Sequence, residues 1–168
     1  MEFFDVIKNR YSVRGYKKDK VEKEKLDKVL EAARLAPTGV NYQGFKVIVI
    51  DTEKNKEGLK KIYDRDWFVE APLVLCVVAD KSNTWTRPWD AKNIADIDAT
   101  IVMDHIILAA TYLGLGTCYI AAFKKYEAIK FLNLSEEYEP ILFSPLGYSN
   151  ANRADRPRKP ITEIVEYR

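Results

Sequence analysis

Residues 94–117 read IADIDATIVMDHIILAATYLGLGT, and the fold is decided in this stretch. Apolar residues occupy nearly every face of a helix drawn through about Ile94 to Leu113, which is typical of a helix buried in a core or in a subunit interface. The run falls short of the roughly 20 apolar residues that cross a membrane, so we expect a buried helix of a globular domain. Gly114 or Gly116 is expected to end the helix, because glycine accepts the left-handed conformation of a helix cap.

Helical and strand patterns alternate on both sides of this segment. Buried strands are expected where apolar and β-branched residues run between polar or turn residues, at 45–51, 71–80, 117–123 and 140–149. Helices are expected near residues 3–7 and over 22–36, 54–63 and 125–132, followed by a last apolar element at 161–167. This interleaving predicts an α+β or α/β fold, and 168 residues without a linker or repeat predict one domain spanning 1–168.

The composition is that of an ordinary globular protein. With 27 Lys and Arg against 25 Asp and Glu the net charge is +2, and 31% of the residues are charged and 47% hydrophobic. These values exclude a disordered chain and argue against a general nucleic-acid binder. The first residues, MEFFDVIKNR, carry acids where a signal peptide carries cations. We therefore expect no nucleic-acid partner, no membrane partner and a cytoplasmic location.

The rare reactive residues restrict the chemistry further. Cys76 and Cys118 each stand alone in apolar runs, which excludes a disulfide framework and a cysteine-rich zinc site. His105, the only histidine, is interpreted as a packed or dimer-facing helix residue, with a chemical role as the alternative. Histidine-based nucleophile systems and metal sites therefore lack support, and no metal is expected. If the chain is an enzyme, a bound cofactor is expected to carry the difficult chemistry.

Two short segments concentrate positive charge although the whole chain is nearly neutral. The first, NRYSVRGY, holds Arg10 and Arg14 with Ser12 between them. The second, RPRKP, holds Arg156, Arg158 and Lys159. Guanidinium groups with a hydroxyl donor match a dianionic phosphate ester. Both segments interrupt regular elements, where loops can converge on a ligand. A solvated, salt-bridged surface is the alternative.

The loop PTGVNYQG at 37–44 is a weaker candidate. Its backbone amides, with Thr38, Asn41 and Gln43, are the kind of donors and acceptors that contact the edge of a heterocycle, although a plain helix-to-strand turn uses similar residues. Neither GxGxxG nor GxxxxGK(S/T) occurs, so a dinucleotide fingerprint and a P-loop are excluded.

Taken in order along the chain, these stretches resemble the nitroreductase family of FMN-dependent oxidoreductases. Each motif is loose by itself, and their shared order and spacing over essentially the whole chain carries the resemblance. The matching motifs are Arg10-x-Ser12-x-Arg14, Ala36-Pro37-Thr38-Gly39-x-Asn41-x-Gln43, Ala71-Pro72, Ile97-Asp98-Ala99, Leu108-Ala109-Ala110 followed by Gly114-Leu115-Gly116-Thr117, Leu146-Gly147-Tyr148, and Arg156-x-Arg158-Lys159-Pro160.

The resemblance implies an α+β fold, a three-layer α/β/α sandwich around a central, mostly antiparallel sheet. It also implies a homodimer with FMN held by both subunits. The implied reaction is hydride transfer from NADH or NADPH to nitroaromatic, quinone or enone acceptors by a ping-pong mechanism. Two alternatives stay open: a non-catalytic protein that binds FMN or another phosphate ligand, and a flavin enzyme of the same fold with a different reaction, such as reductive dehalogenation.

The resemblance assigns cofactor-binding roles and no catalytic side chain, because the flavin N5 carries the hydride. Arg14 is implied to face the pyrimidine side of the ring, where a guanidinium favours the negative charge of the reduced flavin. The residues implied to bind the phosphate are Arg10, Ser12, Arg156 and Arg158. Those implied to contact the partner subunit's flavin are Thr38, Gly39 and Asn41, and the backbone of Ala121 and Ala122 is implied to pass near N5. The cofactor-binding set also includes Tyr11, Pro37 and Tyr119.

The sequence departs from the family pattern at several positions. Asp64 stands where longer members have an asparagine that contacts the ring. The short 82–93 segment leaves little room for a long lid, so a fairly open active site is expected. Trp85 and Trp89 in this segment are interpreted as core or dimer packing, with a place at the substrate mouth as the alternative. Cys118, in apolar company, is expected to be inert.

Overall fold

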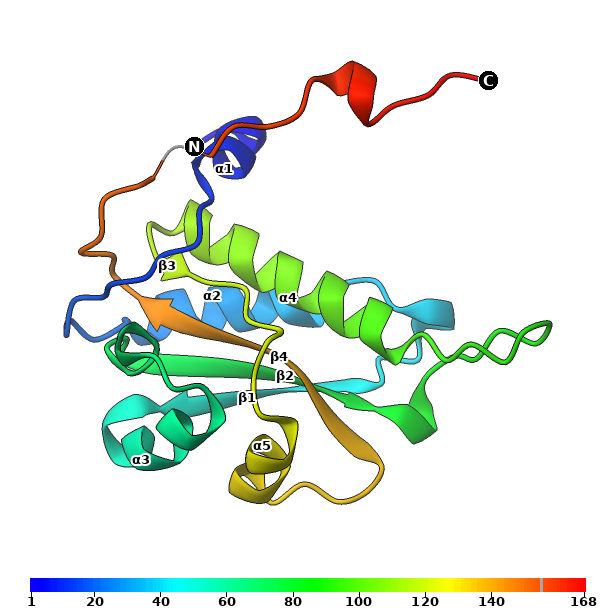
Figure 1. Cartoon of the computed structure of the whole chain (residues 1–168), viewed down its shortest axis with the longest axis horizontal. Coiled ribbons are helices and arrows are strands. Elements are labelled where there is room, and N and C mark those ends of the chain that lie inside the picture. The colour runs from blue at the N-terminus through cyan, green and yellow to red at the C-terminus, as the bar shows by residue number, and fades with distance from the viewer. Residues whose placement is uncertain (155) are drawn as a thin grey trace.

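A four-stranded antiparallel sheet forms the centre of the computed structural model, which describes residues 1–154 and 156–168 (Figure 1). The strands follow the spatial order β1-β2-β4-β3, and each neighbouring pair runs antiparallel. β2 and β4 are therefore the inner strands. The strands are β1 (Phe45–Asp51), β2 (Leu73–Asp80), β3 (Gly116–Thr117) and β4 (Tyr138–Gly147).

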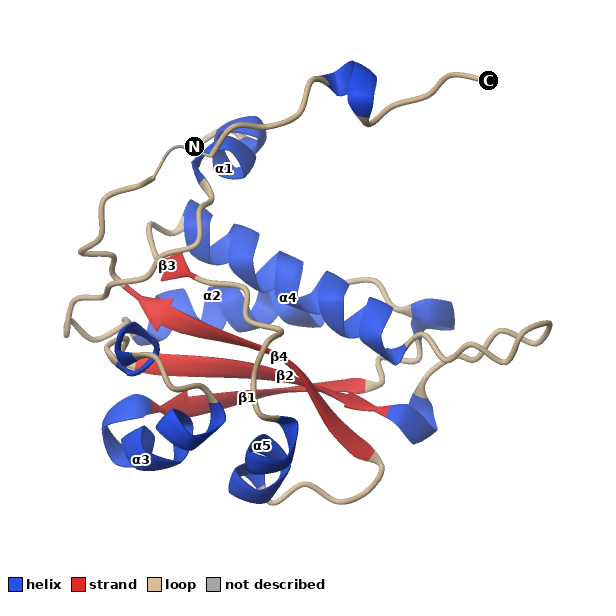
Figure 2. Cartoon of the chain, viewed as in Figure 1, coloured by secondary structure: helices blue, strands red, loops and turns tan. Residues whose placement is uncertain are grey.

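Helices cover both faces of this sheet, which gives three layers (Figure 2). α2 (Lys23–Arg34) and α4 (Ala95–Tyr112) lie on one face, and α3 (Thr52–Ile62) and α5 (Lys125–Leu132) lie on the other. The short α1 (Phe3–Asn9) lies apart from the sheet, beside one end of α4. The α+β fold with an α/β/α sandwich and an antiparallel central sheet, expected from the family resemblance, is thus confirmed.

The side chains of β2 point alternately into the two helical layers. Leu75 and Val77 belong to the core cluster with α2 and α4, whereas Val74, Cys76 and Val78 belong to the cluster with α3 and α5. All five side chains are fully buried. A strand covered on both faces reads as a continuous apolar run, which explains the sequence LVLCVVA and confirms the predicted buried strand.

α4 is the long apolar helix predicted from the 94–117 stretch. Met103 and Ile106 on it are fully buried, and the helix packs on both α2 and the sheet. Gly114 follows the helix with φ 76°, and the Leu115 N–H donates to the Ala110 carbonyl at 2.8 Å. Gly114 is therefore the left-handed residue that ends the helix, one of the two glycines expected to do so.

α3 begins at Thr52, earlier than the expected start at Lys54. The carboxylate of Asp51, the last residue of β1, accepts a hydrogen bond from the Lys54 N–H at 3.2 Å. An aspartate in this position satisfies a free N–H of the first turn and so starts the helix directly after the strand.

The predicted third strand over 117–123 is wrong in extent. β3 consists of Gly116–Thr117, and the chain then leaves the sheet except for one bridge between Ile120 and Phe143. Cys118 and Ile120 point into the α3/α5 core, while Tyr119 is exposed. The alternation that suggested a strand is real, but it comes from packing on one side and not from ladder pairing.

The last apolar element at 161–167 is also shorter than expected. One 3₁₀ turn, Ile161–Glu163, forms there, and Ile161 and Ile164 remain 66% and 64% exposed. Figure 1 shows this tail extending away from the sandwich beyond α1. Apolar residues in the tail therefore lack a partner surface within the described part of this chain. In that part, no helix combines the length and hydropathy needed to span a bilayer.

Replacing Phe143 tests the α3/α5 core. Its fully buried ring lies edge-on to Phe68 and Phe123, at centroid distances of 6.3 Å and 4.8 Å. Phe143→Ala is expected to lower the free energy of unfolding by about 3–5 kcal/mol in a denaturant titration. Tyr126→Ala is the control, because Tyr126 is 86% exposed on α5 and its loss should change stability by less than about 0.5 kcal/mol. Equal effects of the two substitutions would contradict this account of the core.

Candidate functional site

Segments from the two ends of the chain lie side by side at one end of the sheet (Figure 1). The backbone N–H of Lys17 donates to the Tyr148 carbonyl at 2.8 Å, and the N–H of Asn150 donates to the Gly15 carbonyl at 3.1 Å. Gly15 permits this approach, because a Cβ at that position would lie 2.5 Å from Asn150 Oδ1. The pairing brings together the two regions of sequence that carry the predicted cationic segments.

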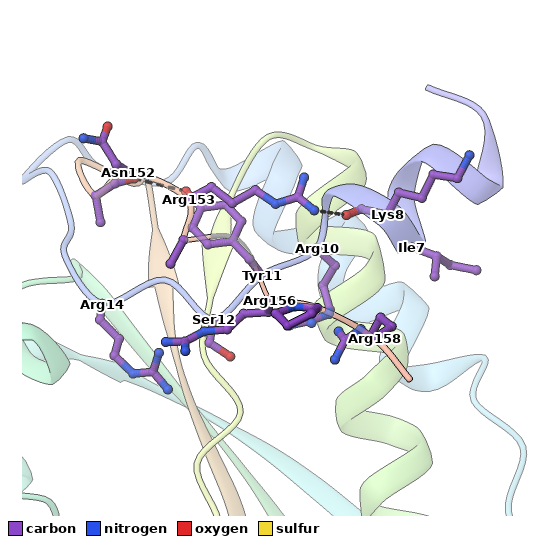
Figure 3. A pocket seen from close by; sticks show the side chains of 13 residues that line it. Ile7, Lys8, Arg10, Tyr11, Ser12, Arg14, Asn152, Arg153, Arg156 and Arg158 are labelled. Atoms are coloured by element: carbon purple, nitrogen blue, oxygen red, sulfur yellow. Dashed lines mark hydrogen bonds between the residues drawn. The ribbon is translucent and has the colours of Figure 1, made fainter. Parts of the chain in front are cut away.

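Side chains hold the C-terminal segment against α1. The Tyr11 hydroxyl donates to Ser149 Oγ at 3.0 Å. The Arg153 guanidinium donates to Asn9 Oδ1 at 3.2 Å. It also donates to the Lys8 carbonyl at 2.5 Å (Figure 3). Tyr11 is among the predicted cofactor residues, whereas Arg153 is not. Arg153 belongs to the same basic tail, but its sequence does not distinguish an arginine that anchors the tail from one that faces a ligand.

A cavity of about 1020 Å³ opens between these segments (Figure 3). Arg10, Ser12 and Arg14 line it from the N-terminal side, and Arg156 and Arg158 line it from the C-terminal side. In Figure 3 Arg10, Arg156 and Arg158 gather near Ser12, and Arg14 lies on the other side of Ser12. The volume suits a cofactor-sized ligand. The rest of the lining is Ile7, Lys8, Tyr11, Ala151, Asn152, Arg153, Ala154 and Pro157.

The cavity is strongly cationic. Every charged side chain among its described lining residues is basic, with Lys8 and Arg153 joining the arginines of the two predicted segments. Within residues 1–154 and 156–168, no carboxylate forms an ion pair with Arg10 or Arg14, or with Arg156 or Arg158. Among the described residues, the salt-bridged alternative applies to Lys159 of the second segment, which faces Glu163 at 3.9 Å, and not to these arginines. Guanidinium groups gathered without a counter-charge favour an anion that offers several oxygens.

Arg14 lines the cavity, and Cys118 lies near Arg14 and Ser12 without lining it. The Arg14 guanidinium carbon is 5.8 Å from the centroid of the Trp67 ring. Cys118 is 3% exposed, and burial raises the pKa of its thiol, although the nearby Arg14 charge and a hydrogen bond with Ser12 act in the opposite direction. A buried thiol with a raised pKa stays protonated at neutral pH, which agrees with the expectation that Cys118 is inert.

The predicted loop residues lie elsewhere in the molecule. Pro37, Thr38, Gly39 and Asn41 belong to the connection between α2 and β1, at the end of the sandwich opposite to α1 (Figure 1). They are absent from the lining of the cationic cavity. One chain by itself therefore does not bring this loop and the cavity together.

The remaining predicted positions also lie outside the described lining of the cavity. Tyr119, Ala121 and Ala122 are exposed in the segment that follows β3. That segment starts close to the cavity, because Thr117 pairs with Ser12 through an isolated bridge. Asp64 is exposed after α3. The single chain thus gathers the predicted phosphate residues and Arg14, but not the other predicted ring residues.

The Trp85–Trp89 segment forms a hairpin that projects from the far end of the sandwich (Figure 1). The two rings meet edge to face with centroids 6.3 Å apart, and Trp89 is 75% exposed. Arg87 and Asp90 form an ion pair at 2.5 Å across the tip. Core packing is therefore wrong for Trp89, because the hairpin places its ring in solvent.

His105 takes part in none of these sites. It is half-buried on α4, and its Nδ1 lies 3.0 Å from the Ile101 carbonyl, as expected for a packed helix residue. Among the described residues, no group of three or more histidine, cysteine, aspartate or glutamate side chains could hold a metal ion.

The fold and the cavity define a three-layer α+β protein with a cationic cavity where its two terminal segments meet. The family model described as the nitroreductase family matches residues 7–67 and 59–148, which is most of the chain. The chain belongs to the nitroreductase family.

Solved structures and a curated relative agree with this membership. A nitroreductase family protein from Clostridium difficile 630 is 40% identical with a TM-score of 0.93, and the match covers 99% of this chain and 98% of that one. An FMN-dependent nitroreductase from Clostridium difficile R20291 is 30% identical with a TM-score of 0.78, covering 92% and 91% of the two chains. An FMN reductase (NAD(P)H) of Bacillus subtilis is 26% identical over 175 residues, covering 95% of this chain and 70% of the relative.

Proposed function

We propose that this protein is an FMN-dependent oxidoreductase that transfers hydride from NADH or NADPH to a small electron acceptor. The observation that carries the proposal is the cavity where Arg10, Ser12, Arg156 and Arg158 converge without a described carboxylate among them. Membership of the nitroreductase family supports it, as do the relatives named as FMN-dependent and as an FMN reductase.

The chemistry of this donor set fits FMN. Its phosphate ester carries close to two negative charges at neutral pH, and guanidinium forks with a serine hydroxyl form charge-assisted hydrogen bonds to such a group. When bound, FMN supplies hydride transfer at N5, so the chain needs no catalytic acid or base of its own. This agrees with a site whose described lining contains neither a carboxylate nor a histidine.

Arg14 is proposed to tune the cofactor and not to hold the phosphate. It lies across Ser12 from the other arginines, and Trp67 supports its guanidinium. An exposed guanidinium without a described carboxylate partner favours negative charge on the pyrimidine edge of a flavin.

The FMN site is proposed to be completed by a second copy of the chain, with one FMN-binding domain, residues 1–168, in each subunit. In a two-fold dimer, the loop with Thr38, Gly39 and Asn41 of each subunit is able to reach the cavity of the other. Apolar side chains exposed on α1 and the C-terminal tail support such an interface, which would remove them from water. These side chains are Phe3, Phe4, Ile7, Ile161, Ile164 and Val165.

The proposed acceptors are nitroaromatics, quinones or enones, reduced by a ping-pong mechanism. The projecting hairpin supports this class of acceptor. The base of the hairpin packs on the loop of Gly39, since a Cβ at Gly39 would lie 3.3 Å from the Trp85 Cβ. In the proposed dimer, the hairpin therefore reaches the partner subunit together with this loop. Trp89 offers an exposed aromatic face, and pairing with Asp90 neutralises Arg87. Such a surface favours flat, uncharged acceptors.

The visible spectrum of the purified protein tests the proposal. We expect flavin absorption bands, their bleaching by NADH or NADPH without oxygen, and their return on addition of a quinone or nitroaromatic. Bands that NAD(P)H does not bleach would instead support the non-catalytic FMN-binding alternative. Protein that stays colourless after incubation with FMN would rule out both flavin functions.

Arg158→Ala tests the phosphate assignment. Loss of one charge-assisted hydrogen bond should weaken FMN binding about 10- to 100-fold in a fluorescence titration, with little change for riboflavin, which lacks the phosphate. Lys159→Ala is the matched control, because the neighbouring Lys159 lies outside the described lining of the cavity and faces Glu163 at 3.9 Å. Equal losses for FMN and riboflavin would show that the phosphate binds elsewhere.

Mixed dimers test the shared site. Gly39→Val should distort the loop, because a Cβ there would lie 2.3 Å from Ile94 Cδ1. Arg158→Ala and Gly39→Val homodimers are each expected to bind FMN weakly. A heterodimer of the two, purified through two affinity tags, contains one site with both halves intact and should bind FMN at one of its two sites with native affinity. Failure to regain affinity would indicate that each site is built within one chain.

A further inference from the structure

The loop between α2 and β1 holds an unusual backbone conformation. Val40, Asn41 and Gln43 have φ values of 49°, 59° and 54°, all in the left-handed region. For a β-branched residue such as Val40 this conformation is unfavourable, because its Cβ approaches the following carbonyl. Strain of this kind persists only when the surroundings impose it, and it concentrates at functional sites.

Hydrogen bonds within the loop impose part of this conformation. Thr38 Oγ1 accepts the Gln43 N–H at 2.9 Å, and the Thr38 carbonyl accepts the Asn41 N–H at 3.0 Å. Both bonds close the loop on itself but do not attach it to the rest of the protein. At the far end of the loop, Asn83 Nδ2 donates to the Tyr42 carbonyl at 3.4 Å. The first residues of the loop need an attachment of their own.

Asp98 on α4 provides this attachment. Its Oδ1 accepts the backbone N–H of Gly39 at 3.0 Å, and its side chain is 2% exposed. Gly39 lies close to the start of α4, since a Cβ there would lie 2.3 Å from Ile94 Cδ1, which would have to move, and 3.3 Å from Trp85 Cβ. The carboxylate thus holds the strained loop at its first residue.

The Asp98 carboxylate is incompletely satisfied, which argues against a purely stabilising role. Its Oδ2 is buried and has no hydrogen-bond partner among the described residues. Burial raises the pKa of this carboxyl, and the Gly39 N–H acts in the opposite direction. A buried carboxylate with one free oxygen contributes little to stability compared with an apolar side chain. Its presence on the buried face of α4 is explained by what it holds.

We propose that Asp98 is the positioning residue of the flavin-facing loop: its buried carboxylate holds the loop 39–43, with its three left-handed residues, in the form that meets the partner subunit's FMN. The inference rests on the proposed function for the identity of the ligand. Asp98 does not touch the cofactor in this proposal. It sets the fraction of molecules whose loop has the conformation that binds FMN. Apparent affinity falls in proportion to that population.

Asp98→Ala and Asp98→Asn form the first test. The alanine variant should bind FMN about 10- to 100-fold more weakly, because the Gly39 N–H loses its acceptor and the start of the loop is no longer held. The asparagine variant retains an acceptor for the Gly39 N–H and should stay within about threefold of the wild type. Thr52→Val is the control, since it removes the other buried side-chain oxygen without a described partner, on α3, and should leave FMN affinity unchanged.

Val40→Gly supplies a readout that a purely structural role of Asp98 would not move. Glycine adopts a φ of 49° without strain, so the loop needs less restraint to stay in place. When Val40→Gly is added to Asp98→Ala, the double variant should bind FMN at least about fivefold more tightly than Asp98→Ala alone, because the substitution removes backbone strain. If the affinity loss of Asp98→Ala is the same with and without Val40→Gly, the carboxylate does not act through loop strain and the proposal is overturned.

Hydrogen exchange separates this inference from the proposed function, because it needs no FMN. In the cofactor-free protein, the Gly39 and Gln43 amides should exchange faster in Asp98→Ala than in the wild type and the Thr52→Val control. Equal exchange would overturn the role of Asp98, even if FMN binds. Faster exchange in a protein that does not bind FMN would support the role in positioning the loop and refute the proposed cofactor.

Discussion

Burial of β2 on both faces is the constraint on which the other elements depend. A strand whose side chains are apolar in both directions is stable only between two covering layers, and these are α2 with α4 on one side and α3 with α5 on the other. β4 meets the same requirement, and its Phe143 joins the aromatic cluster beneath α3 and α5. The helices therefore lie over the apolar faces of the two inner strands. The edges of the sheet are not covered in this way.

The cationic cavity uses one of these edges. The central core does not enclose it; the cavity is closed by the Lys17–Tyr148 and Asn150–Gly15 backbone hydrogen bonds and by the Arg153 anchor. Gathering arginines without a described acid opposes folding through repulsion, so this cluster is better explained by a bound anion than by stability. The proposed phosphate supplies the missing negative charge.

The proposed site is divided between opposite ends of the molecule. The arginines proposed to bind the phosphate lie beside α1. The strained loop that contains Val40 and the hairpin that carries the exposed Trp89 lie at the far end (Figure 1). Such a division is of use to a single chain only if another copy brings the two ends together. It also accounts for apolar side chains, such as Phe4 and Ile164, that find no cover within the described residues of one subunit.

The sequence alone determined what depends on local pattern. The apolar run of α4 and the continuous apolar strand β2 follow from helical spacing and burial on both faces, and both are present. Glycine conformation limited the end of α4 to Gly114 or Gly116, and the structure has Gly114 in the left-handed region. Arg10, Ser12, Arg14 and the tail arginines stood out by residue type as candidates for an anion site, and all of them line the cavity. Local pattern gave a wrong extent for the strand predicted at 117–123, where the alternation of buried and exposed residues reflects packing without ladder pairing. At 161–167 the apolar side chains have no surface to pack on among the described residues of this chain.

Only the tertiary structure decided which of these residues meet. The convergence of Arg10 with Arg158 depends on backbone pairing between the ends of the chain, which no local pattern reports. The role of Asp98 is equally hidden, because an acid in the first turns of a helix usually faces solvent and favours the helix dipole. Here the Gly39 N–H and the close approach of the loop turn it inward. The physical reason is the same in both cases: hydrogen bonds between distant segments have energies that depend on geometry, and that geometry exists only after the layers have packed.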